Sequence, residues 1–352
     1  MHNKIIGIVE IAVYAPSGEN SQPWRFEIFK NTLYVYNLPK RDNPIYNYRQ
    51  RGSYLAHGAL IQNISIVAPS FGLIAEIHLF PDQQDTDLVA QISFREALTV
   101  NSEWESVIKQ RSTNRKKYKN EKLDQEIIEK LKKSVEGMSH CDTLFIEDTE
   151  TITKIASYVS VPDRIMLEYK PLHDTIFDNI CWTDTENEKR KMGLFVKTME
   201  LAPPEQVVFR LLKHWSVARC ARVVGLPKFI SQENAKKYST GSVYAVFVVE
   251  DKDDAYVYAG MAMQQLWLTA ITSGLVAHPL AALSYLYESI HAGNMSELLR
   301  EHVEIISLAY TNLSDTCAIS DSQKIAMILR IGKSDPVRAT SPKLKPEITM
   351  RT

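Results

Sequence analysis

The chain has 352 residues, 45% of them hydrophobic, which is enough to bury one large core or two of domain size. The 41 Lys and Arg residues balance the 42 Asp and Glu residues, so the net charge of -1 gives no electrostatic support for binding nucleic acid or an anionic membrane. We therefore expect small-molecule partners, with no nucleic acid and no membrane among them.

The cysteines are widely spaced and contain no Cys-x-x-Cys pair, a pattern that favours free thiols in a reducing compartment over a zinc site or a redox pair. They are Cys141, Cys181, Cys220 and Cys317. Glu10 interrupts the apolar N-terminal stretch, and no cleavage site follows it. No segment reaches the roughly 20 apolar residues of a membrane span. We expect a cytoplasmic protein without a metal site.

The first hundred residues predict helices and strands in alternation: a helix over 5–13, a hairpin over 24–37 with its turn at 30–31, a helix over 53–70, and strands over 75–80 and 88–94. Trp24, Phe26 and Ile28 alternate in the hairpin, which places their side chains in the core. We expect Trp24→Ala to damage folding. Gly72 suits the left-handed position that ends the second helix.

A second unit begins near Asn101. It predicts helices over 104–110, 124–135, 151–159 and 255–273, and strands over 143–146, 243–250 and 325–331. Between them, residues 164–237 mix charged and aromatic side chains and predict a long insertion of short helices, which is more typical of a lid than of a linker. The same order, an apolar helix followed by a glycine and then a strand, occurs around Gly72 and again around Gly274. This weak repeat indicates two related halves that meet near residue 100.

The segment 16–26, PSGENSQPWRF, combines a polar turn with the start of a core strand. Backbone N–H groups, the Ser17 hydroxyl and the Asn20 amide would lie beside an apolar wall, and such a rim can bind the edge of a flat heterocycle. The alternative is an ordinary turn between a helix and a strand, whose polar residues cap backbone groups.

A basic loop follows the helix predicted over 104–110. Residues 111–117, RSTNRKK, combine four cations with three small polar side chains, which suits a phosphate monoester. The alternative is a solvated basic loop. A second basic pair, Lys343 and Lys345, lies in the tail, where an extended chain would put both ammonium groups on one side to close over the same phosphate. A disordered basic tail is the alternative there.

The Pro-Ser-x-x-Asn-x-Gln-Pro-Trp-x-Phe pattern of residues 16–26 resembles the flavin-edge motif of the nitroreductase family of FMN-dependent oxidoreductases. The QRSTNR run at 110–115 and the SPKLKPE run at 341–347 resemble the phosphate-binding elements of that family. Because the chain carries one copy of each, it resembles the Acg-type subgroup, in which two halves are fused.

The resemblance implies an α/β (α+β) nitroreductase-like fold, with two related halves forming a pseudo-dimer in one chain. Residues 1–100 would be the first half, with the flavin-edge turn. Residues 101–352 would be the second half, with the phosphate loop and a lid at 164–237. A monomer is expected, with a homodimer as the alternative.

The resemblance also implies the positions of the FMN contacts. The ring edge would meet Pro16, Ser17, Gly18 and Asn20; the phosphate and ribityl chain would meet Arg111, Ser112, Asn114, Arg115, Lys343 and Lys345; and backbone groups of Pro279, Leu280 and Ala281 would lie near flavin N5. Gly18 departs from the serine of many relatives. His57 would lie near the mouth of the site or would be a satisfied helix residue.

The implied activity is hydride transfer from NAD(P)H through FMN to a small acceptor, nitroaromatic-like or quinone-like, by a ping-pong mechanism. FMN would carry the chemistry, so no catalytic side chain is expected. The alternative is an FMN storage or sequestration protein whose closed lid prevents turnover.

Overall fold

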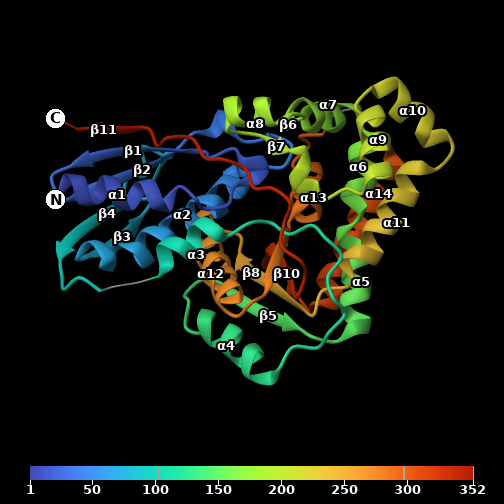
Figure 1. Ribbon diagram of the computed structural model, residues 1–352. Coiled ribbons are helices and arrows are strands. Elements are labelled where there is room, and N and C mark those ends of the chain that lie inside the picture. Colours follow the sequence, from blue (N-terminus) through green and yellow to red (C-terminus); the bar gives the residue numbers. More distant parts are fainter. Residues whose placement is uncertain (101–102, 296–297, 352) are drawn as a thin grey trace.

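The computed structural model describes residues 1–100, 103–295 and 298–351. Two main sheets lie side by side, each accompanied by helices, and a further group of helices lies at one end of the molecule (Figure 1); a small third sheet pairs two short strands, β6 (Ile180–Cys181) and β7 (Leu194–Phe195). The predicted mixed α/β (α+β) fold is confirmed. The predicted start of the second unit at Asn101 lies outside the described residues.

The first sheet is built from the N-terminal part of the chain and one C-terminal strand. Its order is β11-β1-β2-β4-β3, with β1 (Trp24–Phe29), β2 (Thr32–Asn37), β3 (Leu73–Leu79), β4 (Leu88–Glu96) and β11 (Ile348–Met350). The predicted hairpin is confirmed, with Trp24 opposite Asn37 and Lys30 at positive φ in the turn. Trp24 is only 3% exposed and belongs to the main core, as predicted.

The C-terminal strand was not predicted. β11 pairs in parallel with β1, with Ile348 opposite Phe26 and Met350 opposite Ile28. The tail therefore crosses from the second sheet to the edge of the first (Figure 1).

The second sheet has the order β5-β8-β10-β9, with β5 (Asp142–Ile146), β8 (Val243–Glu250), β9 (Val276–Leu280) and β10 (Gln323–Gly332). β8 lies between β5 and β10, and its residues are buried up to Val249. A strand that is apolar on both faces is expected at such a central position. β9 begins soon after Gly274, whose φ of 71° provides the predicted left-handed helix end.

Two long helices join the halves of the molecule. α2 (Arg51–Val67) and α12 (Asp253–Thr272) cross with their backbones in contact. A Cβ atom placed on Gly58 would lie 1.9 Å from the carbonyl oxygen of Val257, and one on Gly260 would lie 2.0 Å from that of Leu55. Only glycine allows this approach, so the crossing is fixed by these two residues.

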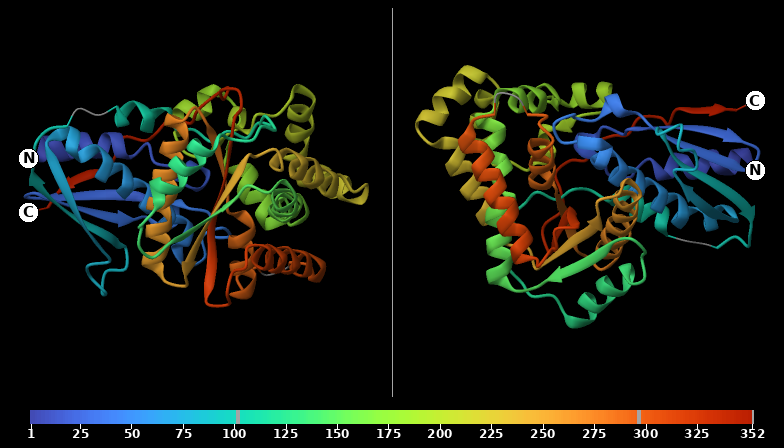
Figure 2. Two further views of the ribbon diagram at one scale, coloured as in Figure 1. Left: turned by 90° about the horizontal axis from the view of Figure 1, so that it is seen from below. Right: turned by 180° about the vertical axis from the view of Figure 1, so that it is seen from behind.

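The predicted insertion consists of short elements, as expected: α6 (Val161–Glu168), α7 (Lys170–Asp178), β6 (Ile180–Cys181), α8 (Asp184–Arg190), β7 (Leu194–Phe195), α9 (Pro203–Leu212), α10 (Trp215–Val223) and α11 (Leu226–Tyr238). They enclose their own apolar cluster around Phe177 and Phe209. In two further views α9, α10 and α11 extend outward from the rest of the molecule (Figure 2).

The other helices are α1 (His2–Ala12), α3 (Trp104–Gln110), α4 (Gln125–Val135), α5 (Thr149–Val159), α13 (Ala282–His291) and α14 (Arg300–Thr316). The last two were not predicted. No helix in the described part of the chain is long and apolar enough to cross a membrane. The cysteines are free, and all but the exposed Cys220 are buried.

Candidate functional site

The three segments singled out in the sequence lie together in the structure. The Arg111 guanidinium of the basic loop donates to the carbonyl oxygen of Tyr14, at 3.1 Å. The Lys343 ammonium of the tail donates to the carbonyl oxygen of Ala15, at 2.9 Å, and to Oδ1 of Asn20, at 2.8 Å. The tail therefore contacts the polar turn, although 323 positions separate Lys343 from Asn20, and the loop contacts Tyr14, two positions before the turn.

The turn itself has an unusual backbone. Glu19, Asn20 and Gln22 all have positive φ, between 47° and 57°, which side-chain-bearing residues rarely adopt. The Ser17 hydroxyl accepts the N–H of Gln22 at 3.0 Å, so it stabilises the turn from within. Such strain persists only where the surroundings hold it, and the contacts from the tail supply that support.

Two half-buried acids belong to this region: Glu19 in the turn and Asp42 beside it. Burial, and to a smaller extent the charge of the neighbouring Glu19, raise the pKa of Asp42 to about 7, although the backbone N–H of Asn43 and the Ser53 hydroxyl oppose this shift. Burial also raises the pKa of Glu19. A Cβ atom on Gly18 would lie 3.1 Å from Asp42 Oδ1, so a serine at this position would crowd the acid.

The cations beside the turn have no acidic partners. Arg111 lies over the ring of Trp267, 4.5 Å from its centre, and its buried Nε has no hydrogen-bond partner in the described structure. Burial lowers the pKa of Arg111 to about 10. Burial, and then the charge of Arg111, lower the pKa of Lys343 well below its usual value. These shifts indicate positive charge that the protein itself leaves unneutralised.

Arg115 belongs to a neighbouring group of cations. It donates to the carbonyl oxygen of Thr198 at 3.1 Å, and burial lowers its pKa. Burial and the charges of Arg330, Arg115 and Lys237 lower the pKa of His278 well below its usual range. Within the described residues, no carboxylate forms an ion pair with Arg111, Arg115 or Lys343. An anion bound here would relieve both the burial cost and the mutual repulsion.

Asn114 connects the loop to its surroundings. Its side chain is buried, its amide donates to the carbonyl oxygen of Asp335 at 2.9 Å, and its Oδ1 accepts the N–H of Lys116 at 3.1 Å. Ser112 is half-buried, whereas Lys345 is exposed. The structure therefore brings Lys343 to the turn but leaves Lys345 on the surface, and the contacts predicted for Ser112, Asn114 and Lys345 stay predictions.

The segment Pro279-Leu280-Ala281 lies where β9 ends and α13 begins. Pro279 is opposite Leu329 and Leu280 opposite Ile328 in β10. The basic loop runs beside the same strand, since Thr113 forms a bridge with Ala277. The segment is thus the end of a strand and not a simple helix-ending turn. Its role as a source of backbone donors for flavin N5 stays a prediction.

The insertion closes over the polar turn. The carbonyl oxygen of Lys191 accepts the side-chain amides of Asn20, at 3.1 Å, and of Gln22, at 2.7 Å. The amide of Asn179, at the end of α7, donates to the Glu19 carboxylate. These contacts join the insertion to the turn, and its role as a lid stays a prediction.

His57 is buried in α2 and bonded through Nε2 to Oδ1 of Asn37, at 3.2 Å. Its ring meets that of Trp24 edge to face, and burial lowers its pKa to about 3, so it is neutral. Of the two interpretations, this geometry supports a buried helix histidine, although only Nε2 is hydrogen-bonded and Nδ1 has no partner in the described structure.

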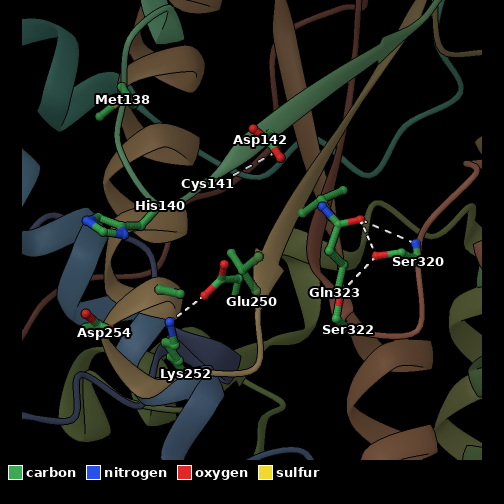
Figure 3. A pocket seen from close by; sticks show the side chains of 13 residues that line it. Met138, His140, Cys141, Asp142, Glu250, Lys252, Asp254, Ser320, Ser322 and Gln323 are labelled. Carbon is green, nitrogen blue, oxygen red and sulfur yellow. Dashed lines mark hydrogen bonds and ion pairs between the residues drawn. The ribbon is translucent and has the colours of Figure 1, made fainter.

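Two surface cavities lie elsewhere. One, of about 340 Å³, is lined by residues of β5, β8 and the loop before β10, where Lys252 pairs with Glu250 at 2.5 Å (Figure 3). The other, of about 430 Å³, is lined by Ile66, Trp104 and Val107 among others. Neither contains a predicted site residue.

One group of side chains has the composition of a metal site. The ligand atoms of Glu168, Glu301 and His302 lie within 4.8 Å of one another. Arg164 pairs with Glu168 at 2.9 Å, and Arg222 pairs with Glu301. Because arginines already neutralise both carboxylates, we interpret the group as an ion-pair network that links α6, α10 and α14.

Comparisons with known proteins gave weak similarities. No family model matches the chain. An uncharacterized protein of Mycobacterium tuberculosis (strain CDC 1551 / Oshkosh), MT1398, is 22% identical over 283 residues, which are 80% of this chain and 39% of that protein. The chain thus spans about two fifths of the length of this relative.

One solved structure to which this chain is similar is an FMN-dependent nitroreductase from Clostridium difficile R20291. The two are 11% identical with a TM-score of 0.35, and the similarity covers 67% of this chain and 89% of the nitroreductase. A nitroreductase-like family protein from Bacillus cereus gives 12% identity and a TM-score of 0.35, over 70% and 94%. Similarities of this extent leave the fold family open, and the site residues carry the proposal that follows.

Proposed function

We propose that this chain binds FMN and is an NAD(P)H-dependent flavin oxidoreductase of the nitroreductase type. The observation that supports this function is the pair of half-buried cations, Arg111 and Lys343, that lies beside the strained polar turn without a carboxylate ion pair in the described residues, with Arg115 in a neighbouring group of cations. A phosphate monoester carries nearly two negative charges and several acceptor oxygens, which match guanidinium and ammonium donors. The turn motif then fits the edge of the flavin ring.

Bound FMN would accept hydride from NAD(P)H and pass electrons to a small nitroaromatic-like or quinone-like acceptor, in ping-pong order. Arg111, Arg115 and Lys343 would hold the phosphate, and the turn around Asn20 would orient the ring edge. The insertion would exclude water from the site through its contacts with the turn. No catalytic side chain is required.

The site takes its parts from segments that are far apart in the sequence. The turn belongs to residues 1–100, whereas the basic loop and the tail belong to residues 101–352. This division supports a pseudo-dimer of the Acg type, with one flavin site and a monomeric chain. A homodimer is the alternative. The unpaired cysteines fit a cytoplasmic location.

The double substitution Arg111→Ala/Arg115→Ala tests the phosphate site. Each charge-assisted hydrogen bond contributes about 1.5–3 kcal/mol, so we expect FMN affinity to fall by at least about 100-fold. Quenching of flavin fluorescence on titration measures it. The matched control is Lys130→Ala/Lys133→Ala, which removes the same charge from exposed positions on α4. Unchanged FMN binding in the first variant, with native circular dichroism, would contradict the site.

Storage or sequestration of FMN is the second candidate function, because the insertion is bonded to the turn through Lys191 and Asn179. An anaerobic visible spectrum of the FMN-loaded protein, taken before and after NADPH or NADH, separates the two functions. Bleaching of the flavin bands supports the oxidoreductase. Flavin that stays oxidised supports storage, and failure to bind FMN would contradict both.

A further inference from the structure

The outer helices of the insertion expose an apolar surface. We call it the lid face; it comprises the solvent-exposed side chains of α9, α10 and the start of α11. Its large apolar members are Val207 (62% exposed), Val208, Leu211 (54%), Val217, Val223 (86%), Val224 (80%) and Phe229 (57%). Single exposed apolar residues are normal, but here several lie on three helices that contact one another in sequence order, a concentration that points to an interaction surface.

The pattern along α9 shows that this surface is not a by-product of core packing. Phe209 and Leu212 are buried and face the apolar cluster of the insertion. Val207 and Leu211 are four residues apart, so they share the opposite, exposed side of the helix. α9 is therefore apolar on the side that packs and also on the side that faces solvent.

Positive charge accompanies these side chains. Residues 203–230 contain Arg210, Lys213, Arg219, Arg222 and Lys228 but only one acid, Glu205. Five cations and one anion give a local charge of +4, in a chain whose net charge is -1. Four of the cations are exposed, while Arg222 pairs with Glu301 of α14. The nearly neutral net charge of the whole chain therefore coexists with a local excess of positive charge in residues 203–230.

We propose that the lid face binds the surface of an anionic lipid bilayer. Helices that carry apolar side chains between exposed cations lie in the membrane interface, where the apolar groups enter the acyl boundary and the cations meet acidic headgroups. A second copy of this chain would bring the same cations face to face, and that repulsion disfavours a dimer through this surface.

The position of these helices agrees with such a contact. α9 and α10 form an outer corner of the molecule, away from both sheets (Figures 1 and 2). The lid face can therefore touch a flat surface while the turn, the basic loop and the tail remain clear of it. The inference uses only the insertion and is independent of FMN binding.

Cosedimentation of the full chain with lipid vesicles tests the proposal. We expect binding to vesicles of equal parts phosphatidylglycerol and phosphatidylcholine, little binding to pure phosphatidylcholine, and weaker binding at high salt. Leu211→Asp should weaken binding about tenfold, since it places an acid in the apolar contact. Leu98→Asp is the matched control, because Leu98 is 89% exposed on a loop of the first half.

Arg210→Glu/Lys213→Glu should likewise weaken binding by about tenfold or more. Its control is Lys130→Glu/Lys133→Glu, which reverses the same charge on α4. Equal binding to both vesicle types, binding to neither, or equal effects of the lid-face and control variants would overturn the proposal. A dimer that Leu211→Asp dissociates, without vesicle binding, would instead identify the lid face as an interface between copies.

Discussion

Asp42 and Glu19 have no cationic partner among the described residues; Glu19 belongs to the turn that we assign to the flavin edge, and Asp42 lies beside it. Asp42 accepts the backbone N–H of Asn43, at 2.9 Å, and the Ser53 hydroxyl, at 3.2 Å. Neutral donors offset only part of the cost of burying a carboxylate. The pKa of Asp42 is therefore raised from 3.8 to about 7, so its protonation changes near neutral pH.

This shift predicts how Asp42 affects stability. Because the pKa of Asp42 is higher in the folded chain than in the unfolded chain, the folded chain binds this proton more tightly. Protonated Asp42 therefore stabilises the fold below about pH 4, and this contribution is lost as the pH rises to about 7. Asp42→Asn removes that loss. We expect the free energy of unfolding of the variant, measured by urea denaturation, to exceed that of the wild type by roughly 2–4 kcal/mol at pH 8. The difference should be much smaller at pH 4.

Asp85→Asn, at an exposed position, is the matched control and should leave the pH dependence unchanged. If Asp42→Asn is less stable than the wild type at pH 8, the carboxylate is stabilising the turn and the assigned direction of its pKa shift is wrong.

The residues of the turn show which part of the site could be predicted from sequence. The pattern at 16–26 indicated a polar turn before a core strand, and both are present. The positive φ of Glu19, Asn20 and Gln22 could not be predicted, because none is glycine and local preference opposes that conformation. Contacts from Lys343 and Lys191, distant in sequence, hold the turn in place.

At the scale of elements, the crossing of α2 and α12 joins the halves through two glycines. Gly58→Ala would force Cβ against the carbonyl oxygen of Val257, which belongs to a helix and cannot move alone. We expect a loss of at least about 3 kcal/mol in the free energy of unfolding, measured by urea denaturation.

Gly7→Ala in α1 is the matched control for this substitution. There the new Cβ would meet only the ring edge of Phe71, a side chain that can shift. A loss in Gly58→Ala as small as that in Gly7→Ala would show that the α2–α12 crossing tolerates a methyl group and does not depend on glycine.

Most helices and strands follow patterns visible in the sequence, because their apolar periodicity matches the face that they bury. α14 has such a pattern, with Ile306, Ala309, Tyr310 and Leu313 buried, so this helix too is predictable from its sequence. β11 differs, since a three-residue strand has no periodicity, and its partner β1 lies at the other end of the chain.

At the scale of the whole molecule, the tail completes both the first sheet and the candidate site. Ile348 packs against the main core beside β1, and Lys343 contacts the turn a few residues earlier. We expect Ile348→Asp to release the tail and to lower FMN affinity about tenfold by removing one charge-assisted contact. Met350→Asp is the control, since Met350 is 51% exposed on the same strand.

Fluorescence titration with FMN measures this effect, and protease sensitivity of the tail reports its release. Tail release without loss of affinity would exclude Lys343 from the phosphate site. The convergence of turn, loop and tail could be anticipated only through the family resemblance, because nothing local in the sequence relates positions 323 residues apart.

The parallel pairing of β11 with β1 also means that the first sheet can be completed only after β11 has been synthesised. Phe26 leaves the ribosome early, but the strand that covers its edge, including Thr349, is made 323 residues later. Until β11 is made, the first sheet has an unpaired edge at β1 that can pair with other nascent chains. Slow elongation between the two strands should therefore prolong the period of aggregation risk, and the proposed binding of FMN should appear only after β11 has docked.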